Sequence, residues 1–162
     1  MNMIVAVDQN WGIGKDNKLL ASVPGDMAFF KSMTMDKVVI MGRRTLESMP
    51  GKRGLKNRIN YVLTRSTDFT AERCTVVHSE EELFSELAKY ESDEVFLIGG
   101  ASLYNKYYDR CEKLYVTKLQ ADLGADTFIV NLDEDERYAI AEESELHEEN
   151  EISYKFCTYI RK

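Results

Sequence analysis

Short runs of consecutive hydrophobic residues mark the first two thirds of the chain. Residues 4–7, 38–41 and 95–98 are unbroken runs rich in valine and isoleucine, and each is followed by a polar residue or glycine. Runs of this length without polar alternation are typical of strands that are buried on both faces. They predict the inner strands of a largely parallel sheet.

The segments between these runs have helical spacing. Residues 25–35 place Asp26, Phe30 and Met33 on one stripe, and the preceding Pro24 suits the first turn of a helix. Three further helices are predicted over residues 43–49, 79–90 and 100–108. Helices that alternate with buried strands are typical of α/β folds.

The last third of the chain has a different pattern. Longer strands are predicted over residues 112–121, 138–146 and 152–160, and in the last of these one set of residues, beginning at Ile152, alternates with a second set. Such alternation is typical of antiparallel strands. The predicted fold class is therefore α/β, with a mixed, mostly parallel sheet that ends in a C-terminal antiparallel hairpin.

Length and charge exclude several classes of protein. The chain has 162 residues, of which 28 are acidic and 21 basic, and its net charge is −7 at pH 7. This balance argues against the broad electropositive face of a nucleic-acid-binding protein. No linker rich in proline, glycine or serine divides the chain, so we expect a single domain over residues 1–162.

Cysteine and histidine are too sparse for a metal centre. The three cysteines are too far apart for a Cys-x-x-Cys motif, and there are only two histidines. An odd number of cysteines fits a reducing compartment, and no hydrophobic run approaches the ~20 residues of a membrane-spanning helix. We expect a soluble, cytoplasmic protein that holds no metal ion.

Charge is unevenly distributed along the chain. Residues 37–73 contain nine basic residues against three acidic ones, and residues 131–151 contain ten acidic residues against one arginine. The basic segment is either a solvated face or a binding surface, and the position of Arg43, Arg44 and Arg65 directly after predicted strands favours binding. The acidic segment lacks calcium-loop spacing and is expected to be a solvated hairpin face.

Two predicted strand-to-helix turns have the composition of phosphate-binding sites. In residues 41–45 a glycine precedes two arginines and a threonine, so guanidinium groups and a hydroxyl lie next to free helix amides. Residues 98–102 repeat the design without the charges, and residues 64–66 end a third strand. Together these turns predict binding of a phosphorylated dinucleotide.

The segment between the first strand and the first helix has no regular pattern. Residues 9–23 contain Gly12 and Gly14, but no helix follows them, so the pair is not the dinucleotide-binding fingerprint. We interpret the segment as a long mobile loop, either an active-site lid or a plain surface loop.

Asp26 is the candidate for acid–base chemistry. A carboxylate in the first turn of a helix is commonly an exposed partner of the helix dipole. Here it shares a stripe with Phe30 and Met33, a face expected to pack inward or to line a pocket. A carboxylate in an apolar pocket has a raised pKa, and it can hold an amidine-like group while it helps to deliver a proton.

Four motifs follow one another along the chain. They are residues 23–31 (VPGDMAFFK), 39–48 (VIMGRRTLES), 98–104 (IGGASLY) and 124–128 (GADTF). In order and spacing they resemble dihydrofolate reductases of the bacterial chromosomal type, and the resemblance covers essentially the whole chain. It implies an eight-stranded sheet flanked by four helices, and NADPH-dependent reduction of 7,8-dihydrofolate to 5,6,7,8-tetrahydrofolate.

The resemblance also implies a substrate site. Asp26 matches the catalytic carboxylate that binds the pterin and promotes its protonation, Thr117 matches its hydrogen-bond partner, and Arg58 matches the arginine that clamps the glutamate α-carboxylate. The apolar walls match Ile4, Val5, Met27, Phe30, Met49, Leu55 and Ile98. For Met49, Leu55 and Ile98 the alternative is an ordinary core position.

A cofactor site for NADPH is implied in the same way. Its residues match Ala6, Ile13, Gly14, Asn17, Gly42, Arg43, Arg44, Thr45, Leu63, Thr64, Arg65, Gly99, Gly100, Ala101, Ser102, Leu103 and Tyr104. Asp126 matches an acid that braces the mobile loop, and the alternative for Tyr104 is packing beside Tyr107. The resemblance further implies a monomer that binds dihydrofolate and antifolate inhibitors, but neither nucleic acid nor a membrane.

One departure lies in the substrate site. The family usually has Pro-Trp before the first helix, where this chain has Leu20-Ala21, and the lost indole removes an apolar wall beside the pterin. Two alternatives stay open, namely a reductase of the same fold for another pyrimidine or pterin, and a nucleotide-binding regulator without catalysis. Arg58 and the stripe that contains Asp26 favour a folate substrate.

Overall fold

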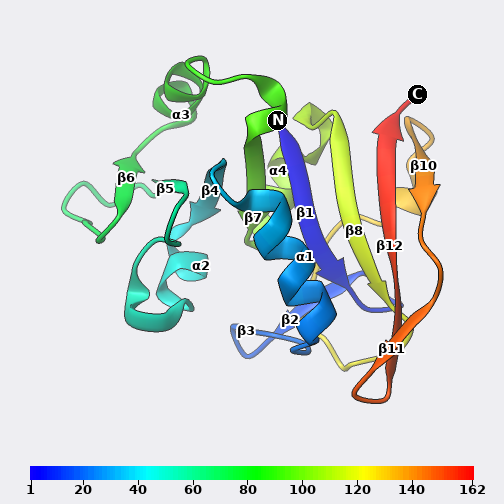
Figure 1. The fold of residues 1–162 in the computed structure, drawn as a ribbon. Coiled ribbons are helices and arrows are strands. Elements are labelled where there is room, and N and C mark those ends of the chain that lie inside the picture. Colours follow the sequence, from blue (N-terminus) through cyan, green and yellow to red (C-terminus); the bar gives the residue numbers. More distant parts are fainter.

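The computed structural model describes residues 1–162 as an α/β fold around one large sheet. Eight strands follow the order β10-β12-β8-β1-β7-β4-β5-β6, and β11 pairs with β12 beside this path (Figure 1). They span Asn2–Val7 (β1), Val38–Gly42 (β4), Ile59–Leu63 (β5), Cys74–Val77 (β6), Val95–Gly99 (β7), Lys113–Leu119 (β8), Tyr138–Glu143 (β10), His147–Glu149 (β11) and Ile152–Arg161 (β12). The eight-stranded mixed sheet expected from the sequence is present.

Strand directions agree with the predicted pattern. The neighbours from β8 through β1, β7, β4 and β5 to β6 are parallel, whereas β12 is antiparallel to both β8 and β10. The three hydrophobic runs became β1, β4 and β7, which lie side by side in the middle of the sheet. In parallel strands all C-terminal ends meet at one edge, and here that edge gathers the predicted glycine turns.

Helices cover both faces of the sheet. They span Pro24–Thr34 (α1), Arg43–Glu47 (α2), Glu80–Leu87 (α3) and Ala101–Tyr107 (α4). Phe30 of α1 and Leu46 of α2 pack with Ile4 on one face, and Leu103 of α4 packs in the cluster of Val5 on the other. Alternate residues of β1 therefore serve the two faces. None of the helices is long and apolar enough to cross a membrane.

The helices begin in different ways. At α3 a capping box forms, in which Ser79 Oγ accepts the N–H of Glu82 at 3.1 Å and the Glu82 carboxylate accepts the N–H of His78 at 3.0 Å. By contrast α1 follows Val23, whose side chain makes no capping hydrogen bond, and its first residue is Pro24. The first turn of α1 thus needs an acceptor from elsewhere in the chain.

Residues 9–23 contain strands, so their interpretation as a long loop is wrong. Gly12–Lys15 (β2) lies between Lys18–Leu19 (β3) and Thr127–Phe128 (β9) in a small three-stranded sheet. The buried carboxylate of Asp8 accepts three backbone N–H groups, from residues 10, 12 and 123, and so holds the turn before β2. One partner of β2, the two-residue strand β3, is close in sequence, but the other, β9, lies over a hundred residues away, and strands this short carry little local signal.

In β12 both sets of alternating residues pack against other parts of the protein. Phe156 belongs to the set that begins at Ile152, and its ring lies tilted against Phe29 of α1, with 4.5 Å between ring centroids. Cys157 and Tyr159 belong to the other set, yet both are buried in the larger core cluster. Tyr159 packs edge-on against Trp11 and its hydroxyl donates to Asp133, so tertiary contacts cover the face on which the second set lies.

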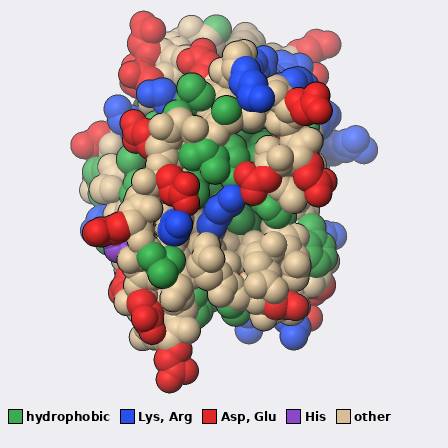
Figure 2. Space-filling view, turned by 90° about the vertical axis from the view of Figure 1, so that its right-hand side faces the viewer, with side chains coloured by type: hydrophobic (Ala, Val, Ile, Leu, Met, Phe, Trp, Pro, Cys, Tyr) green, Lys and Arg blue, Asp and Glu red, His purple; other side chains and the backbone are tan.

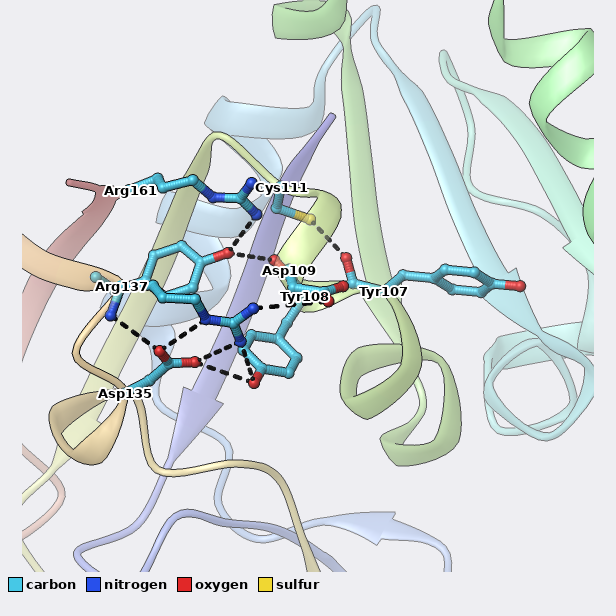
Figure 3. Close-up of polar contacts among 8 residues, drawn as sticks. Tyr107, Tyr108, Asp109, Cys111, Asp135, Arg137 and Arg161 are labelled. Atoms are coloured by element: carbon cyan, nitrogen blue, oxygen red, sulfur yellow. Dashed lines mark hydrogen bonds and ion pairs between the residues drawn. The ribbon is translucent and has the colours of Figure 1, made fainter.

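A polar network fastens the antiparallel end of the sheet to the segment after α4. The Arg137 guanidinium donates to the Asp135 carboxylate at 2.9 and 3.0 Å and to the Tyr108 hydroxyl at 3.0 Å (Figure 3). These hydrogen bonds hold the pKa of Asp135 well below its usual range. Arg161 near the end of β12 donates to the hydroxyl of Tyr138 at 3.0 Å.

The acidic segment is solvated, as expected, with two exceptions. Of the ten acidic residues in 131–151, eight are exposed, and only Asp135 and Glu149 are partly buried. Figure 2, which views the molecule from the side of β10 and β12, shows charged side chains around a central group of hydrophobic ones. Asp135 belongs to the network described above, and Glu149 contacts the first turn of α1.

Replacement of Leu46 by alanine is expected to lower the free energy of unfolding by about 2–5 kcal/mol, because it leaves a cavity under α2. Leu46 is fully buried. Leu146→Ala is the matched control, since Leu146 is 56% exposed, and its effect should stay within ~0.5 kcal/mol. Urea denaturation followed by Trp11 fluorescence measures both variants, and equal effects would contradict the packing described here.

Candidate active site

Asp26 lies in the first turn of α1 and faces strand β8. Its Oδ1 accepts a hydrogen bond of 2.6 Å from the hydroxyl of Thr117, which is 2% exposed. Burial raises the pKa of Asp26, and the hydrogen bond from Thr117 lowers it by a smaller amount. The contact expected between these two residues is therefore present, and the carboxyl is poised to bind or release a proton closer to neutral pH.

Tyr104 approaches the same place from the opposite face of the sheet. Its hydroxyl donates to the main-chain oxygen of Ile4 at 2.8 Å, and the side chain is 5% exposed. Burial raises the pKa of Tyr104 strongly, and the charge of Asp26 contributes in the same direction. The phenol stays protonated and links α4 to β1 beside Asp26, whereas Tyr107 packs edge-on against Phe84.

The expected apolar walls come together on the α1 face, with two exceptions. Ile4 and Ile98 are buried in one cluster, and Phe30, Met49 and Leu55 pack on it while partly exposed. Partial exposure leaves Phe30, Met49 and Leu55 accessible to a ligand, whereas Ile98 is 8% exposed, as an ordinary core position is.

The two exceptions are Val5 and Met27. The Val5 side chain lies in the cluster on the opposite face, so only its main chain can reach the α1 side. Met27 is 56% exposed, and its sulfur accepts a hydrogen bond of 3.2 Å from Ser22. Met27 therefore lies at the rim of the apolar wall.

Arg58 lies near the C-terminal end of α1 and forms no ion pair. Its Nε donates to Thr34 Oγ1 at 3.3 Å and its Nη1 donates to the main-chain oxygen of Lys56 at 2.8 Å. Burial lowers the pKa of Arg58, and the nearby charge of Asp36 raises it, so the guanidinium stays charged. With Nη2 unpartnered, the side chain can bind a carboxylate at the end of the apolar wall.

The two glycine turns predicted to bind phosphate are neighbours in space. In the strand register Met41 lies opposite Gly99, and Gly42 lies opposite Leu63. A Cβ at Gly99 or Gly100 would lie 3.2 Å from Thr45 Oγ1, and Gly99 has a φ of +137°, which other residues rarely adopt. Glycine at these two positions therefore lets the second turn pack closely against Thr45 in the first.

Basic side chains lie beside these turns. Arg43 forms an ion pair of 3.4 Å with Glu47 and covers the ring of Phe69 at 4.5 Å, whereas Arg44 and Arg65 are exposed and form no ion pair. Two free guanidinium groups at one strand edge favour an anionic ligand. The residues that the sequence assigned to the cofactor along this edge are Ala6, Gly42, Arg43, Arg44, Thr45, Leu63, Thr64, Arg65, Gly99, Gly100, Ala101, Ser102 and Leu103.

His78 also lies at this edge, although no role was predicted for it from the sequence. Its Nδ1 is 3.0 Å from the main-chain oxygen of Thr64, and the ring is partly exposed. A signal was available, because Val77-His78-Ser79 is a strand-to-helix junction like the two glycine turns. No group of three or more His, Cys, Asp or Glu side chains could hold a metal ion.

Ile13 and Gly14 lie in β2, and exposed Asn17 lies in the turn after it. Asp126 braces this turn as expected, because its Oδ2 accepts the N–H of Asp16 at 3.0 Å and its own N–H bonds to the oxygen of Gly14 at 3.0 Å. The end of β2 and the turn after it are therefore tied to the residue that precedes β9.

Trp11 does not stand in for the missing indole at position 21. Its ring is buried in the larger cluster, edge-on to Tyr159 with 6.1 Å between centroids, on the face opposite α1. Ala21 is partly buried and packs with Val23, Leu119 and Tyr154. Ala21 is therefore part of a small apolar cluster, and no tryptophan lies in it.

Comparison with known proteins identifies relatives of full length. A family model described as dihydrofolate reductase matches residues 1–161. The dihydrofolate reductase of Bacillus subtilis is 36% identical, over 100% of this chain and 95% of the relative. That of Haemophilus influenzae is 36% identical, over 99% and 98%. A solved structure of Enterococcus faecalis dihydrofolate reductase with NADP(H) and RAB-propyl has a TM-score of 0.87 and 34% identity, over 99% of this chain and 95% of that one.

Replacement of Asp26 by asparagine is expected to stabilise the fold increasingly as pH rises. Because burial holds the pKa of Asp26 above its ordinary value of 3.8, the wild-type protein loses stability as pH rises through the folded-state pKa. Asparagine does not titrate, so the difference in the free energy of unfolding grows with pH and then levels off. Urea denaturation of both proteins across a pH series measures it. A difference independent of pH would contradict the assigned pKa shift.

Proposed function

The chain belongs to the dihydrofolate reductase family, and from this membership we propose which of its residues carry the reaction. The enzyme reduces 7,8-dihydrofolate to 5,6,7,8-tetrahydrofolate with NADPH, in service of one-carbon metabolism. This activity sets aside the two alternatives, a reductase of another pyrimidine and a regulator without catalysis. The observation that carries the residue assignment is the hydrogen bond from Thr117 to the partly buried Asp26.

Asp26 is the proposed catalytic residue. Its carboxylate can accept N–H bonds from the amino group and the adjacent ring nitrogen of the pterin, while Thr117 holds its Oδ1. The raised pKa increases the affinity of Asp26 for a proton, which promotes protonation beside the carbon that accepts hydride. NADPH supplies that hydride when bound.

The rest of the substrate site holds the folate in line with Asp26. The half-exposed wall of Phe30, Met49 and Leu55 is proposed to pack against the apolar part of the substrate, with Ile4 and Ile98 beneath it. Arg58, at the far end of α1, is proposed to bind the glutamate α-carboxylate through its free Nη2. Val5 is proposed to contribute main-chain atoms only, and Met27 the rim.

The C-terminal strand edge is proposed to hold NADPH. The glycine turns allow the diphosphate to approach the backbone, Thr45 adds a hydroxyl, and Arg44 and Arg65 are free to bind the 2′-phosphate. Tyr104 closes the site beside the nicotinamide. The main chain of Ala6 and the β2 turn with Ile13, Gly14 and Asn17 complete it, and a hydride acceptor then lies next to its donor.

Partners and location follow from the same membership. The enzyme binds dihydrofolate and antifolate inhibitors. We propose that it is a single-domain monomer that binds no nucleic acid, which its net charge of −7 supports. A cytoplasmic location is proposed because its three cysteines are unpaired and two of them, Cys111 and Cys157, are buried.

Asp26→Asn is expected to retain NADPH binding and to lose turnover at neutral pH by about 10²- to 10⁴-fold, because an amide supplies no acid–base function. Turnover should recover in part as pH falls and dihydrofolate protonates in solution. Loss of NADPH absorbance with dihydrofolate measures turnover, and a fluorescence titration measures binding. Asp93→Asn, at an exposed carboxylate in a 3-10 turn, is the control. Unchanged turnover in Asp26→Asn would overturn its proposed role.

Arg65→Ala is expected to raise the KM for NADPH about 10- to 100-fold and to leave the KM for NADH nearly unchanged, since a charge-assisted hydrogen bond contributes about 1.5–3 kcal/mol. Arg53→Ala, in the same basic segment, removes an exposed arginine that pairs with Glu72 at 3.3 Å and serves as the control. Steady-state kinetics with both cofactors provides the comparison, and equal effects on NADPH and NADH would argue against 2′-phosphate binding.

A further inference from the structure

The first turn of α1 is capped by a residue from the other end of the chain. Val23 supplies no capping side chain, and Pro24 has no N–H, so the N–H of Gly25 is the first that requires an acceptor. That N–H donates to Glu149 Oε1 at 2.9 Å, across 124 positions of sequence. Glu149 therefore takes the place that a serine or aspartate before the helix commonly has.

Tyr154 holds the capping carboxylate in place. Its hydroxyl hydrogen-bonds to the same Oε1 of Glu149, and its side chain is only 2% exposed. Burial, followed by the hydrogen bond to Glu149, raises the pKa of Tyr154 to about 12, so the hydroxyl stays protonated and donates. His147, two residues before Glu149, stacks on the Tyr154 ring with 5.3 Å between centroids.

Glu149 and Tyr154 leave no space for a side chain at position 25, so glycine is needed there. The φ of Gly25 is not in the left-handed region, so its backbone conformation does not require glycine. A Cβ at this position would overlap both the Glu149 carboxylate and the Tyr154 hydroxyl. The three residues therefore form one interlocking contact, and a larger side chain at position 25 would displace the cap.

The β11–β12 hairpin, which carries Glu149 and Tyr154, also contacts α1 one turn further along. Phe29 of α1 and Phe156 of β12 lie 4.5 Å apart by ring centroids, and His147 lies edge-on to Phe156 at 5.4 Å. The β11–β12 hairpin thus contacts α1 at its first turn and again four residues later. Two contacts, one polar and one aromatic, therefore set the position of α1 relative to this hairpin.

We propose that Glu149, with Tyr154, is a positioning residue for the catalytic carboxylate. Asp26 directly follows Gly25, so the hydrogen bond that fixes the Gly25 N–H also fixes the backbone that carries Asp26. Thr117 of β8 holds the carboxylate from one side, and Glu149 of β11 holds its backbone from the other. This inference rests on the catalytic role proposed for Asp26.

Displacement of a catalytic group by a fraction of an ångström lowers the rate of the chemical step and leaves remote binding intact. Glu149→Ala is therefore expected to lower kcat about 10-fold or more, with the KM for NADPH unchanged. Glu149→Gln keeps an oxygen acceptor for the Gly25 N–H and should retain most of the turnover. Glu148→Ala, at the exposed neighbour in β11, is the matched control and should behave as wild type.

A double-mutant cycle with Asp26→Asn separates positioning from general stability. If Glu149 acts through Asp26, then Glu149→Ala lowers kcat much less in the Asp26→Asn protein than in the wild type. Two effects that multiply would overturn the proposal, as would a wild-type kcat in Glu149→Ala. Thermal unfolding of each variant is measured in parallel. If Glu149→Ala does not fold, Tyr154→Phe takes its place in the same cycle and is judged by the same outcomes.

The experiment also distinguishes the two levels of the argument. Full turnover in Asp26→Asn overturns the proposed role of Asp26 itself. An impaired Asp26→Asn beside a fully active Glu149→Ala overturns only the positioning role. Gly25→Ala is the second probe, because its methyl group displaces the Glu149 carboxylate without removing it, and it should reproduce the loss of kcat in Glu149→Ala.

Discussion

The partly buried carboxylate of Asp26 is the group on which the arrangement of α1 depends, because an ionisable side chain away from water raises the free energy of the folded state. The pKa of Asp26 stays raised only while its carboxyl group remains partly buried. The Thr117 hydroxyl stabilises the ionised form without abolishing the raised pKa. The distances between strand β8, helix α1 and the hairpin that caps α1 must therefore stay constant. The rest of the sheet provides the rigid frame that maintains them.

Parallel strands determine where the second half of the site can lie. Because β1, β4, β5 and β7 all end at one edge, short turns such as Gly42 and Gly99 are brought together although 57 positions separate them. Two arginines without ion pairs then lie beside these turns. In the proposed arrangement a hydride donor at this edge reaches an acceptor under α1, because β1 is shared by both halves.

The sequence predicted the elements whose signal is local and missed those whose signal is distant. Unbroken hydrophobic runs were enough to identify β1, β4 and β7, and helical spacing put Asp26 on the correct face of α1. Strand β2 was missed because it and its local partner β3 are very short and its other partner, β9, is remote. The burial of Tyr159 could not be predicted because it depends on packing against Trp11, which is remote in sequence. Nothing in the sequence distinguishes Glu149 from the nine other acidic residues of 131–151. Only the tertiary fold shows that it contacts α1.

The cap on α1 also orders events during biosynthesis. Asp26 precedes Glu149 by 123 positions and Tyr154 by 128, so the backbone around Asp26 leaves the ribosome well before the residues that hold it. Contacts of such long sequence separation are slow to form in folding. A nascent chain can therefore assemble much of its parallel sheet while the carboxylate of Asp26 is still loosely held, and the first turn of α1 is secured only after the β11–β12 hairpin has been made.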